Sequence, residues 1–557
     1  MRYPKTTLGI VIVVCLAAWA YQQQTALLLQ WVTFQNAQRH HVAPARPIDW
    51  DRGPDTAPEP DLPRRPNIIL IVADDLGYND LSTFGGGVAG GRVQTPHIDR
   101  LAAEGVIFSQ SYSGAATCAP SRAMLMTGRY PTRTGFAFTP MVNGMGRMIA
   151  RISNAMDTGL PPARFDAQVA ATKPLYEHQG LPAEEVTLAE VLRSGGYHTA
   201  HIGKWHLGRD FGMAPHEQGF DESLLMASGL YLPEDHPNVV NARLPFDPID
   251  QFLWASMTYA NSFNSGDADR FEPGGYLTDY WTDEAIRVID ANQNRPFFLY
   301  LAHWGVHSPL QATRDDYEAV GDIEPHRLRV YAAMVRALDR SVGRMIAALD
   351  ERGLSDDTLV IFTSDNGGAG YLGLPDLNAP YRGWKVTQFE GGIRVPLFMR
   401  WPGVIPSGSQ VDRPVAHIDV FPTLAGAATS APPASLEIDG RDLLPLATDP
   451  SKAMWEPRPL FWEAGDYRVV RFGDWKLQVT SEPLQRWLFN LAEDPTEQNN
   501  VIDSRPEKTQ ELLGLLQSHY ADARVPLYEA EVVFAIPLDK HQAEPFFADD
   551  EFVYVAN

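Results

Sequence analysis

The sequence predicts an α/β fold: a large mixed, mostly parallel sheet flanked by helices, plus a smaller C-terminal α+β domain with an antiparallel sheet. Two observations predict it. After Pro66, apolar strand-like runs alternate with helical patterns, which is typical of an α/β sheet. The chain has 557 residues, too many for one small core, so a large domain with a smaller one beside it is expected.

The expected elements of the large domain follow one another along residues 67–430. A strand at 68–73 comes first, then a helix through Ile98 and Leu101 that ends at Gly105, and a second helix at 188–193 that ends at Gly195. The longest expected helix covers 328–351 and stops at Gly353. Its apolar stripe is Tyr331, Met334, Val335, Leu338, Val342, Met345 and Leu349. A strand at 358–363 follows it directly.

The pattern changes after about residue 430. Pro432 and Pro433 are followed by short strand-like runs at 467–471 and 475–479 and by one amphipathic stretch at 508–520. Short runs of this kind favour an antiparallel sheet with a helix. We therefore expect the large domain at 67–430 and a smaller C-terminal domain with its tail at 431–557.

The N-terminus predicts export. Arg2 and Lys5 precede an apolar run at 8–19, and Ala18-Trp19-Ala20 offers a cleavage site, so residues 1–20 are expected to be a signal peptide. The alternative is an N-terminal anchor within residues 8–34, although glutamines at 22–24 interrupt the apolar stretch. Residues 21–66, with seven prolines from Pro44 to Pro66, are expected to form an extended linker before the first strand.

Cysteine usage and net charge restrict the compartment and the partners. Only Cys15 and Cys118 are present, and removal of the signal would leave one thiol and no internal disulfide. This pattern fits a bacterial periplasm or the extracellular space better than a eukaryotic secretory route. The formal net charge of -23 argues against a nucleic-acid partner. A small anionic substrate is still compatible with it, because a local cluster of cations can hold one.

Four strand-like runs end in polar residues that suit the cleavage of an anion. The residues are Asp74 and Asp75 after the run 67–73, Lys204 and His206 after 198–202, His307 after 297–302, and Asp365 and Asn366 after 358–363. In open α/β sheets, ligands bind beyond the carboxyl ends of the strands. These side chains are therefore expected to converge on one site.

Asp74, Asp75, Asp365 and Asn366 form an all-oxygen set that suits a hard cation such as Ca²⁺, with Mg²⁺ as the alternative. Zinc would favour nitrogen or sulfur ligands. Taken alone, the two adjacent aspartates also fit a turn and helix cap, and residues 364–368 also fit a surface turn. The cation site therefore depends on the convergence of both motifs.

Cys118 is expected beside a helix N-terminus. Pro120 is suited to a first helical turn, and Gly128 would end the helix. The N-H groups and positive partial charge at such an end favour an anion. A buried, unreactive thiol is the competing interpretation for a cysteine seen without context.

Two long motifs resemble the signatures of the sulfatase family, an arylsulfatase-like, formylglycine-dependent branch of the alkaline-phosphatase superfamily. The first is Cys118-x-Pro120-Ser121-Arg122, followed by Thr127-Gly128, Pro131 and Gly135. The second is Gly196-Tyr197-x-Thr199, followed by the hexapeptide 203–208. The resemblance extends over most of residues 67–500. Residues 136–182 are longer than the family leads us to expect, which indicates an insertion near the substrate pocket.

This resemblance implies a sulfuric ester hydrolase that cleaves the S-O bonds of aryl or carbohydrate sulfate esters. Cys118 would be oxidised to formylglycine, whose hydrate would place one hydroxyl on the cation, attack sulfur and then expel sulfate with its second hydroxyl. The remaining roles implied are sulfate binding by Lys204 and Lys385, support of the hydrated aldehyde and metal ligands by Arg122, proton acceptance by His206, and protonation of the leaving oxygen by His307. Cys118, as formylglycine, would join the metal ligands.

Local alternatives remain for three of these residues. His206, between Trp205 and Leu207, also fits a packed core position, and Lys385 also fits a solvated surface charge. His303, four residues before His307, competes with it for the role of the acid.

The implied partners are a sulfated small molecule or glycan and a formylglycine-generating or other sulfatase-maturing enzyme. A membrane is expected as a partner only if the N-terminal segment is not cleaved. The alternative function is hydrolysis of phosphodiesters or phosphonate esters on the same scaffold. Phosphatase activity with two zinc ions is less expected, because the second zinc would require histidine ligands at the position of Asn366. A non-catalytic binder of sulfated glycans is the alternative from a different class.

Overall fold

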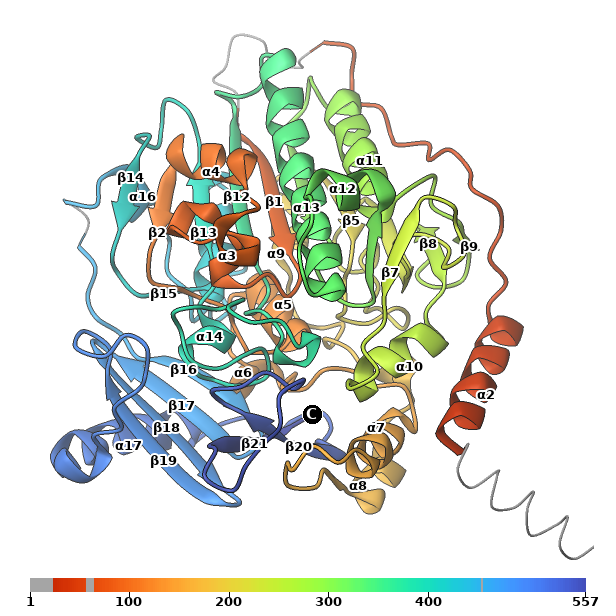
Figure 1. Ribbon diagram of the computed structural model, residues 1–557. Helices are drawn as coiled ribbons and strands as arrows, with labels where there is room; N and C mark the ends of the chain where they lie inside the picture. The colour runs from red at the N-terminus through yellow and green to blue at the C-terminus, as the bar shows by residue number, and fades with distance from the viewer. Residues whose placement is uncertain (1–23, 57–64, 452–453) are drawn as a thin grey trace, which may run out of the picture.

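A ten-stranded mixed sheet forms the centre of the molecule (Figure 1). The structure is a computed structural model that describes residues 24–56, 65–451 and 454–557. Within the sheet, β12, β1, β10, β5 and β6 are parallel neighbours, and strands at both edges add antiparallel pairs. In spatial order the strands are β14 (Ser409–Val411), β2 (Val106–Phe108), β13 (Leu397–Arg400), β12 (Thr358–Ser364), β1 (Asn67–Ala73), β10 (Phe297–Ala302), β5 (His198–Gly203), β6 (Glu222–Gly229), β8 (Tyr259–Phe263) and β9 (Arg270–Phe271).

Helices cover both faces of this sheet, as predicted. In β1, Ile69 and Ile71 point into one apolar core, whereas Ile68, Leu70 and Val72 point into the other. Because both faces are buried, the strand is one continuous apolar run rather than an alternating one. The first core is closed by α4 (Pro96–Ala103), α11 (Leu277–Ala291) and α13 (His326–Glu351), and the second by α5 (Cys118–Thr127), α9 (Leu188–Ser194) and α15 (Val420–Ala427).

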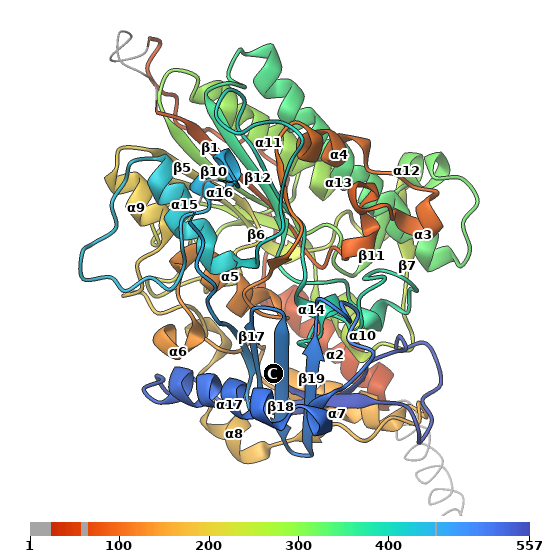
Figure 2. The same ribbon diagram turned by 90° about the vertical axis from the view of Figure 1, so that its left-hand side faces the viewer.

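A four-stranded antiparallel sheet forms the smaller C-terminal unit (Figure 2). Its strands are β16 (Leu460–Ala464), β17 (Tyr467–Phe472), β18 (Trp475–Ser481) and β19 (Leu484–Asn490), with α17 (Pro506–Tyr520) packed against them. Its apolar core also includes Tyr112, Phe389 and Ile393 from the large domain. The small sheet is therefore joined to the large domain through a shared core.

The insertion at 136–182 and the C-terminal tail, which the sequence left unplaced, pack against each other. The tail strand β20 (Val532–Pro537) pairs with β4 (Arg164–Phe165) of the insertion on one side and with the tail strand β21 (Phe552–Ala556) on the other. Helix α7 (Met145–Ala155) contributes Ile149 and Ala150 to a small core with Val532. The chain also forms α8 (Ala167–Thr172) in the insertion and β7 (Val239–Ala242), α10 (Pro248–Ser256), β11 (Leu310–Thr313), α12 (Arg314–Ala319) and α14 (Glu390–Ile393) elsewhere.

The segment predicted to be an extended linker is packed against the large domain over part of its length. Its described part starts with helix α2 (Gln24–Arg39), and further on Ile48 and Trp50 are buried in the large core. The indole N-H of Trp50 donates to Glu284 at 2.6 Å. The apolar side chains between the prolines account for this difference from a solvated spacer. The predicted signal peptide at 1–20 lies outside the described residues, and the helices that are described are too short or too polar to cross a bilayer.

Candidate active site

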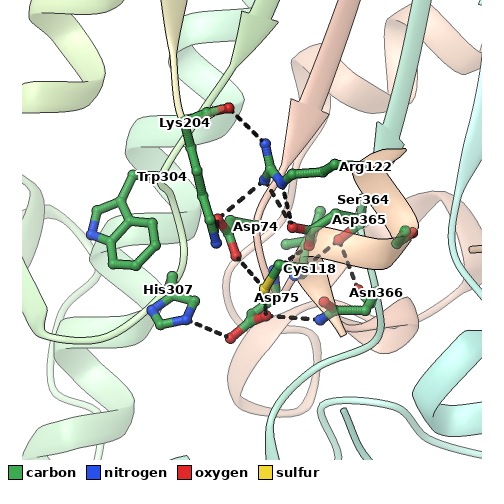
Figure 3. Close-up of polar contacts among 12 residues, drawn as sticks. Asp74, Asp75, Cys118, Arg122, Lys204, Trp304, His307, Ser364, Asp365 and Asn366 are labelled. Carbon is green, nitrogen blue, oxygen red and sulfur yellow. Dashed lines mark hydrogen bonds and ion pairs between the residues drawn. The ribbon is translucent and has the colours of Figure 1, made fainter. Parts of the chain in front are cut away.

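The polar ends of four strands converge because the strands are neighbours. β12, β1, β10 and β5 are consecutive and parallel, so their carboxyl ends lie at one edge of the sheet. Figure 3 shows the side chains that meet there. The structure brings together, in one buried cluster, the predicted residues Asp74, Asp75, Cys118, Arg122, Lys204, His307, Asp365 and Asn366. Lys385 is also buried there and contacts Asp75.

Cys118 is the first residue of α5, and Thr117 is its N-cap. Its sulfur lies 3.7 Å from Oδ1 of Asp74 and 3.9 Å from Oδ1 of Asp75. Burial, and then the charge of Asp365, raise the pKa of the Cys118 thiol, so an unmodified Cys118 stays protonated near neutral pH. The thiol is therefore a poor nucleophile as it stands, although it faces the two carboxylates directly.

Arg122, one turn further along α5, ties Asp74 to Asp365. Its guanidinium Nη2 lies 3.1 Å from Asp74 and 2.8 Å from Asp365, and its Nη1 donates to the carbonyl of Lys204 at 3.0 Å. Burial, followed by Asp365, raises the pKa of Asp74 to about 7, although Lys204 at 2.6 Å opposes the shift. Arg122 remains charged, because its carboxylate neighbours outweigh the cost of burial and raise its pKa.

Asp75 is the centre of the other half of the site. Lys385 Nζ lies 2.7 Å from its Oδ1, the Tyr371 hydroxyl donates to its Oδ2 at 2.9 Å, and Asn366 Nδ2 donates to its Oδ1 at 2.8 Å. Burial alone would raise the pKa of Asp75, but Lys385 and then His307 lower it well below its ordinary value. Asp75 is therefore ionised at neutral pH.

His307, and not His303, faces the cluster. His307 Nε2 lies 3.5 Å from Asp75 Oδ2, and its Nδ1 lies 2.6 Å from the Ser308 carbonyl, to which it donates. His303 instead points into the core, where its Nε2 lies 2.9 Å from the Ser341 hydroxyl. His206 is half-buried, and burial followed by Lys204 lowers its pKa well below the ordinary value.

Two aromatic residues that the sequence did not single out belong to the site. Trp304 stacks on His307 with ring centroids 4.0 Å apart, and Lys204 Nζ lies 4.7 Å from the centre of the Trp304 ring. Tyr371 joins Asp75 to Lys385, whose Nζ lies 3.2 Å from its hydroxyl. Neither was given a role from the sequence, since an aromatic side chain taken alone usually indicates packing.

The site has the chemistry of a cation site. Ligand atoms of Asp74, Asp75, Cys118 and His307 all lie within 4.8 Å of one another. Oδ1 of Asn366 is buried and accepts no hydrogen bond from the described residues, as a metal ligand would in the absence of its ion. Both carboxylate oxygens of Asp365 already accept hydrogen bonds. Its Oδ2 accepts one from Arg122, and its Oδ1 accepts one from the Asp75 N-H at 3.3 Å. The carboxylate and amide oxygens of Asp74, Asp75 and Asn366 fit a hard cation, whereas the thiol of Cys118 and the imidazole of His307 are not ligands that such a cation prefers.

Three of the nine described non-glycine residues with positive φ lie at this site or next to it. Asp75, His206 and Val386 all adopt positive φ, at 59°, 63° and 74°, which is uncommon for residues other than glycine and a genuine outlier for a β-branched one. Gly367 has to be glycine, because a Cβ there would lie 1.9 Å from the Gly391 carbonyl oxygen. The turn after β12 is thereby pressed against the segment that follows Lys385.

The loop that carries Lys385 is held by backbone hydrogen bonds and by a buried ion network. Val386 donates to the Ala116 carbonyl at 2.7 Å, close to Cys118, and Gly391 of α14 donates to the Arg382 carbonyl at 2.7 Å. The first residue of α14, Glu390, is fully buried and pairs with Lys476 of β18 at 3.0 Å. Lys476 also pairs with Glu497 at 2.9 Å. This ion network links the C-terminal sheet to the Lys385 loop.

Two protein-family models match the chain. The model described as "Sulfatase" matches residues 66–430, and the model described as "N-sulphoglucosamine sulphohydrolase, C-terminal" matches residues 383–524. The first covers well over half of the chain and contains all the predicted site residues.

Similar proteins carry sulfatase names. The chain is 35% identical to a steryl-sulfatase of Mus musculus over 70% of its own length and 66% of that protein. It is 34% identical to an N-acetylgalactosamine-6-sulfatase of Canis lupus familiaris over 74% and 72%. The solved structure of Ps i-CgsB in complex with k-i-k-neocarrahexaose matches with a TM-score of 0.67 and 29% identity, over 84% of this chain and 95% of that one. A phosphonate monoester hydrolase of Agrobacterium radiobacter, at 20% identity and a TM-score of 0.57, shares the fold.

Proposed function

The chain belongs to the sulfatase family, and from that premise we propose that it hydrolyses sulfate esters with a formylglycine made from Cys118 and a bound divalent cation. The enzyme is a sulfuric ester hydrolase: water and the ester give an alcohol and sulfate. The observation that carries the proposal is the position of Cys118 at the start of α5, facing Asp74 and Asp75 with Lys204 and Lys385 beside them.

A formylglycine at position 118 could carry out the nucleophilic attack and the release of sulfate that the unmodified thiol cannot. A buried thiol with a raised pKa has little thiolate to react with, whereas the hydrated aldehyde supplies an oxygen nucleophile and can release sulfate afterwards. The conversion requires a formylglycine-generating or other sulfatase-maturing enzyme as a partner. Such an enzyme would have to act before folding is complete, because Cys118 is buried in the folded chain.

Asp74, Asp75, Asp365 and Asn366 would hold the cation, and the modified residue 118 would join them. Their oxygen atoms favour Ca²⁺, with Mg²⁺ as the alternative. When bound, the cation supplies the positive charge that lowers the pKa of a hydroxyl on the modified side chain. The unpartnered Oδ1 of Asn366 supports its inclusion in this set.

The cationic side chains bind and orient the sulfate. Lys204 and Lys385 would donate to sulfate oxygens, since both ammonium groups are buried at the carboxyl edge of the sheet and cannot be solvated there. Arg122 would keep the carboxylates of Asp74 and Asp365 in place, and its contacts with both support this role. Its role is therefore to position the ligands.

The two histidines would move the protons. His307 donates from Nδ1 to a backbone carbonyl, so its Nε2 is the nitrogen that can exchange a proton with the leaving oxygen. Stacking on Trp304 keeps the imidazole in this orientation. His206 would accept the proton from the hydroxyl that expels sulfate. Its buried Nδ1 has no hydrogen-bond partner among the described residues, which leaves that nitrogen free for the task.

We favour a sulfated carbohydrate as the substrate over a simple aryl sulfate. The support is the similarity to a solved protein that binds k-i-k-neocarrahexaose and to N-acetylgalactosamine-6-sulfatase. A panel of sulfated oligosaccharides, with a steryl sulfate and an aryl sulfate for comparison, tests this preference. Faster turnover of the aryl or steryl ester than of every sugar would contradict it.

The reaction itself is tested by relative turnover of an aryl sulfate and an aryl phosphodiester. Protein made in a host with a maturing enzyme should cleave the sulfate faster, and a Cys118→Ala variant should cleave neither. Faster phosphodiester cleavage would favour the alternative function, a phosphodiester or phosphonate-ester hydrolase on the same fold.

We also propose that the enzyme is exported, to the periplasm or beyond, by residues 1–20. The basic start and the apolar run at 8–19 support this location, as does the absence of any cysteine pair in the chain after Ala20. The N-terminal sequence of the exported protein tests it, with Tyr21 expected as the first residue. Protein that stays in the cytoplasm would contradict the proposal.

A further inference from the structure

Helix α2 has one face that is covered by the rest of the protein and one apolar face that is not. It packs on α10, where the Thr33 hydroxyl donates to the Ala255 carbonyl at 3.0 Å and Asn36 donates to the Ser256 carbonyl. Leu29 and Val32 lie on the same side of the helix as Asn36 and are partly buried. The opposite side carries Leu27, Leu28, Trp31 and Phe34, which we call the α2 apolar face. Their exposed fractions are 40%, 37%, 56% and 55%.

This clustering is unlike the rest of the surface. The described residues expose twelve large apolar side chains, and four of them are these neighbours on one helix. The other eight are spread over separate segments, as single exposed apolar residues commonly are. Figure 1 shows α2 at the periphery of the molecule, with α10 on its inner side. A contiguous exposed apolar face of this kind indicates a contact surface.

The composition of the helix favours a lipid interface. No charged residue occurs between Gln24 and Gln38, and the polar residues are glutamine, threonine and asparagine. Trp31 and Phe34 stack with ring centroids 5.7 Å apart, so the face presents a broad aromatic surface. Aromatic rings, tryptophan above all, are favoured at the boundary between hydrocarbon and headgroups.

The position of α2 in the chain points to the same partner. The apolar run at 8–19, preceded by Arg2 and Lys5, lies only a few residues before the helix. During export that run enters the membrane, which brings α2 to the outer surface of the bilayer. A second copy of the chain is a less suitable occupant, because two chains that each carry a net charge of -23 repel one another.

We propose that the α2 apolar face binds the outer surface of a lipid bilayer and keeps the exported enzyme at the membrane. The inference rests on the export proposed above but not on the reaction. Leu27, Leu28, Trp31 and Phe34 enter the interface, while the covered side of the helix stays on α10. Because α2 has no cation before Arg39 and the chain is acidic, binding gains nothing from anionic headgroups. Phosphatidylcholine should bind the protein better than phosphatidylglycerol.

Flotation of the exported protein with phosphatidylcholine vesicles tests the proposal. The α2 variant combines Leu27→Ser, Trp31→Ser and Phe34→Ser. The matched control combines Leu175→Ser, Leu484→Ser and Phe547→Ser, whose side chains are similarly exposed on other segments. Wild type and control should float with the vesicles, and the partition of the α2 variant should fall by about tenfold or more, given the apolar area removed. An unchanged urea unfolding midpoint in all three shows that each is folded.

Three outcomes would overturn the proposal. The first is equal flotation of wild type and the α2 variant, which would mean that another segment, such as residues 1–20, supplies the affinity. The second is a wild-type protein that does not float at all. The third is self-association of the wild type in sedimentation experiments without vesicles that the α2 variant abolishes, which would make a second copy the occupant. None of these outcomes bears on whether the enzyme cleaves sulfate esters, so the two proposals can fail separately.

Discussion

Lys476→Met tests whether the C-terminal sheet holds Lys385 in the site. Lys476 is fully buried between Glu390 and Glu497, and Glu390 begins the short helix that packs behind the Lys385 loop. Methionine keeps the length and apolar volume of the side chain but removes its charge. Both glutamates then lose the cation that they share.

The loss in free energy of unfolding depends on which partners Glu390 and Glu497 keep after the change. Removing one partner of a buried ion pair costs about 3–5 kcal/mol. Glu390 keeps Arg394 at 3.2 Å and the Tyr112 hydroxyl at 2.7 Å. Burial raises the pKa of Glu497 to about 7 although Lys476 opposes it, so this carboxyl can take up a proton when the lysine is gone. We therefore expect a loss of about 3 kcal/mol at pH 7, at the lower end of that range.

The same change should weaken sulfate binding, because displacement of the loop moves Lys385. Loss of one charge-assisted hydrogen bond corresponds to about a tenfold rise in the inhibition constant of inorganic sulfate. Glu497→Gln is the matched control: it leaves Lys476 and Glu390 paired and should cost about 1 kcal/mol with little change in sulfate inhibition. Equilibrium unfolding in urea and competitive inhibition measure the two effects. A Lys476→Met protein that is destabilised yet binds sulfate as tightly as the wild type would refute the inference that the C-terminal sheet holds Lys385 in the site.

Two further changes test the site, and one tests Asp80, a buried carboxyl outside it. Tyr371→Phe removes the hydroxyl that bonds Asp75 and lies beside Lys385, and should lower kcat/KM by about tenfold with little loss of stability; an unchanged kcat/KM would contradict its place in the site. Burial raises the pKa of Asp80 from 3.8 to about 7, so the native state holds more protons than the unfolded one and stability should fall as pH rises from about 4 to 7. Asp80→Asn should reduce this fall in stability, measured as the difference between the urea midpoints at pH 5 and pH 8. An equal difference in the variant and the wild type would contradict the raised pKa of Asp80. Chelation should abolish sulfatase activity and lower the melting temperature, and added Ca²⁺ should restore both; a Tm that does not respond to Ca²⁺ would argue against the cation site.

The sheet and the edge at which the site lies could be predicted from local patterns. β1, β10 and β12 are mostly apolar runs, whereas β5 is buried but contains His198, Thr199 and His201. The polar residues that follow these four strands converge because parallel neighbours end at the same edge. Cys118 could be placed at a helix start from Pro120 and Gly128 alone. The fold class predicted from these patterns is confirmed by the structure.

Contacts between distant segments could not be predicted in this way. β4 has two residues and pairs with β20 across more than 360 positions, so no local pattern marks it as a strand. Tyr371 lies in a short 3-10 helix (Gly370–Leu372) and Trp304 in a loop, and at both places an aromatic side chain indicates packing until its neighbours are known. Lys476 lies in the C-terminal sheet, and its connection to Lys385 runs through Glu390, which is 86 residues earlier. The packing of Ile48 and Trp50 was missed because prolines dominate the surrounding sequence.

The most direct test of the account is the mass of the tryptic peptide 101–122, taken from protein made with and without a sulfatase-maturing enzyme. The account predicts that the peptide carries formylglycine at position 118 only when that enzyme is present, and that sulfatase activity rises in proportion to the modified fraction. A fully active protein in which Cys118 is an intact thiol would contradict the account.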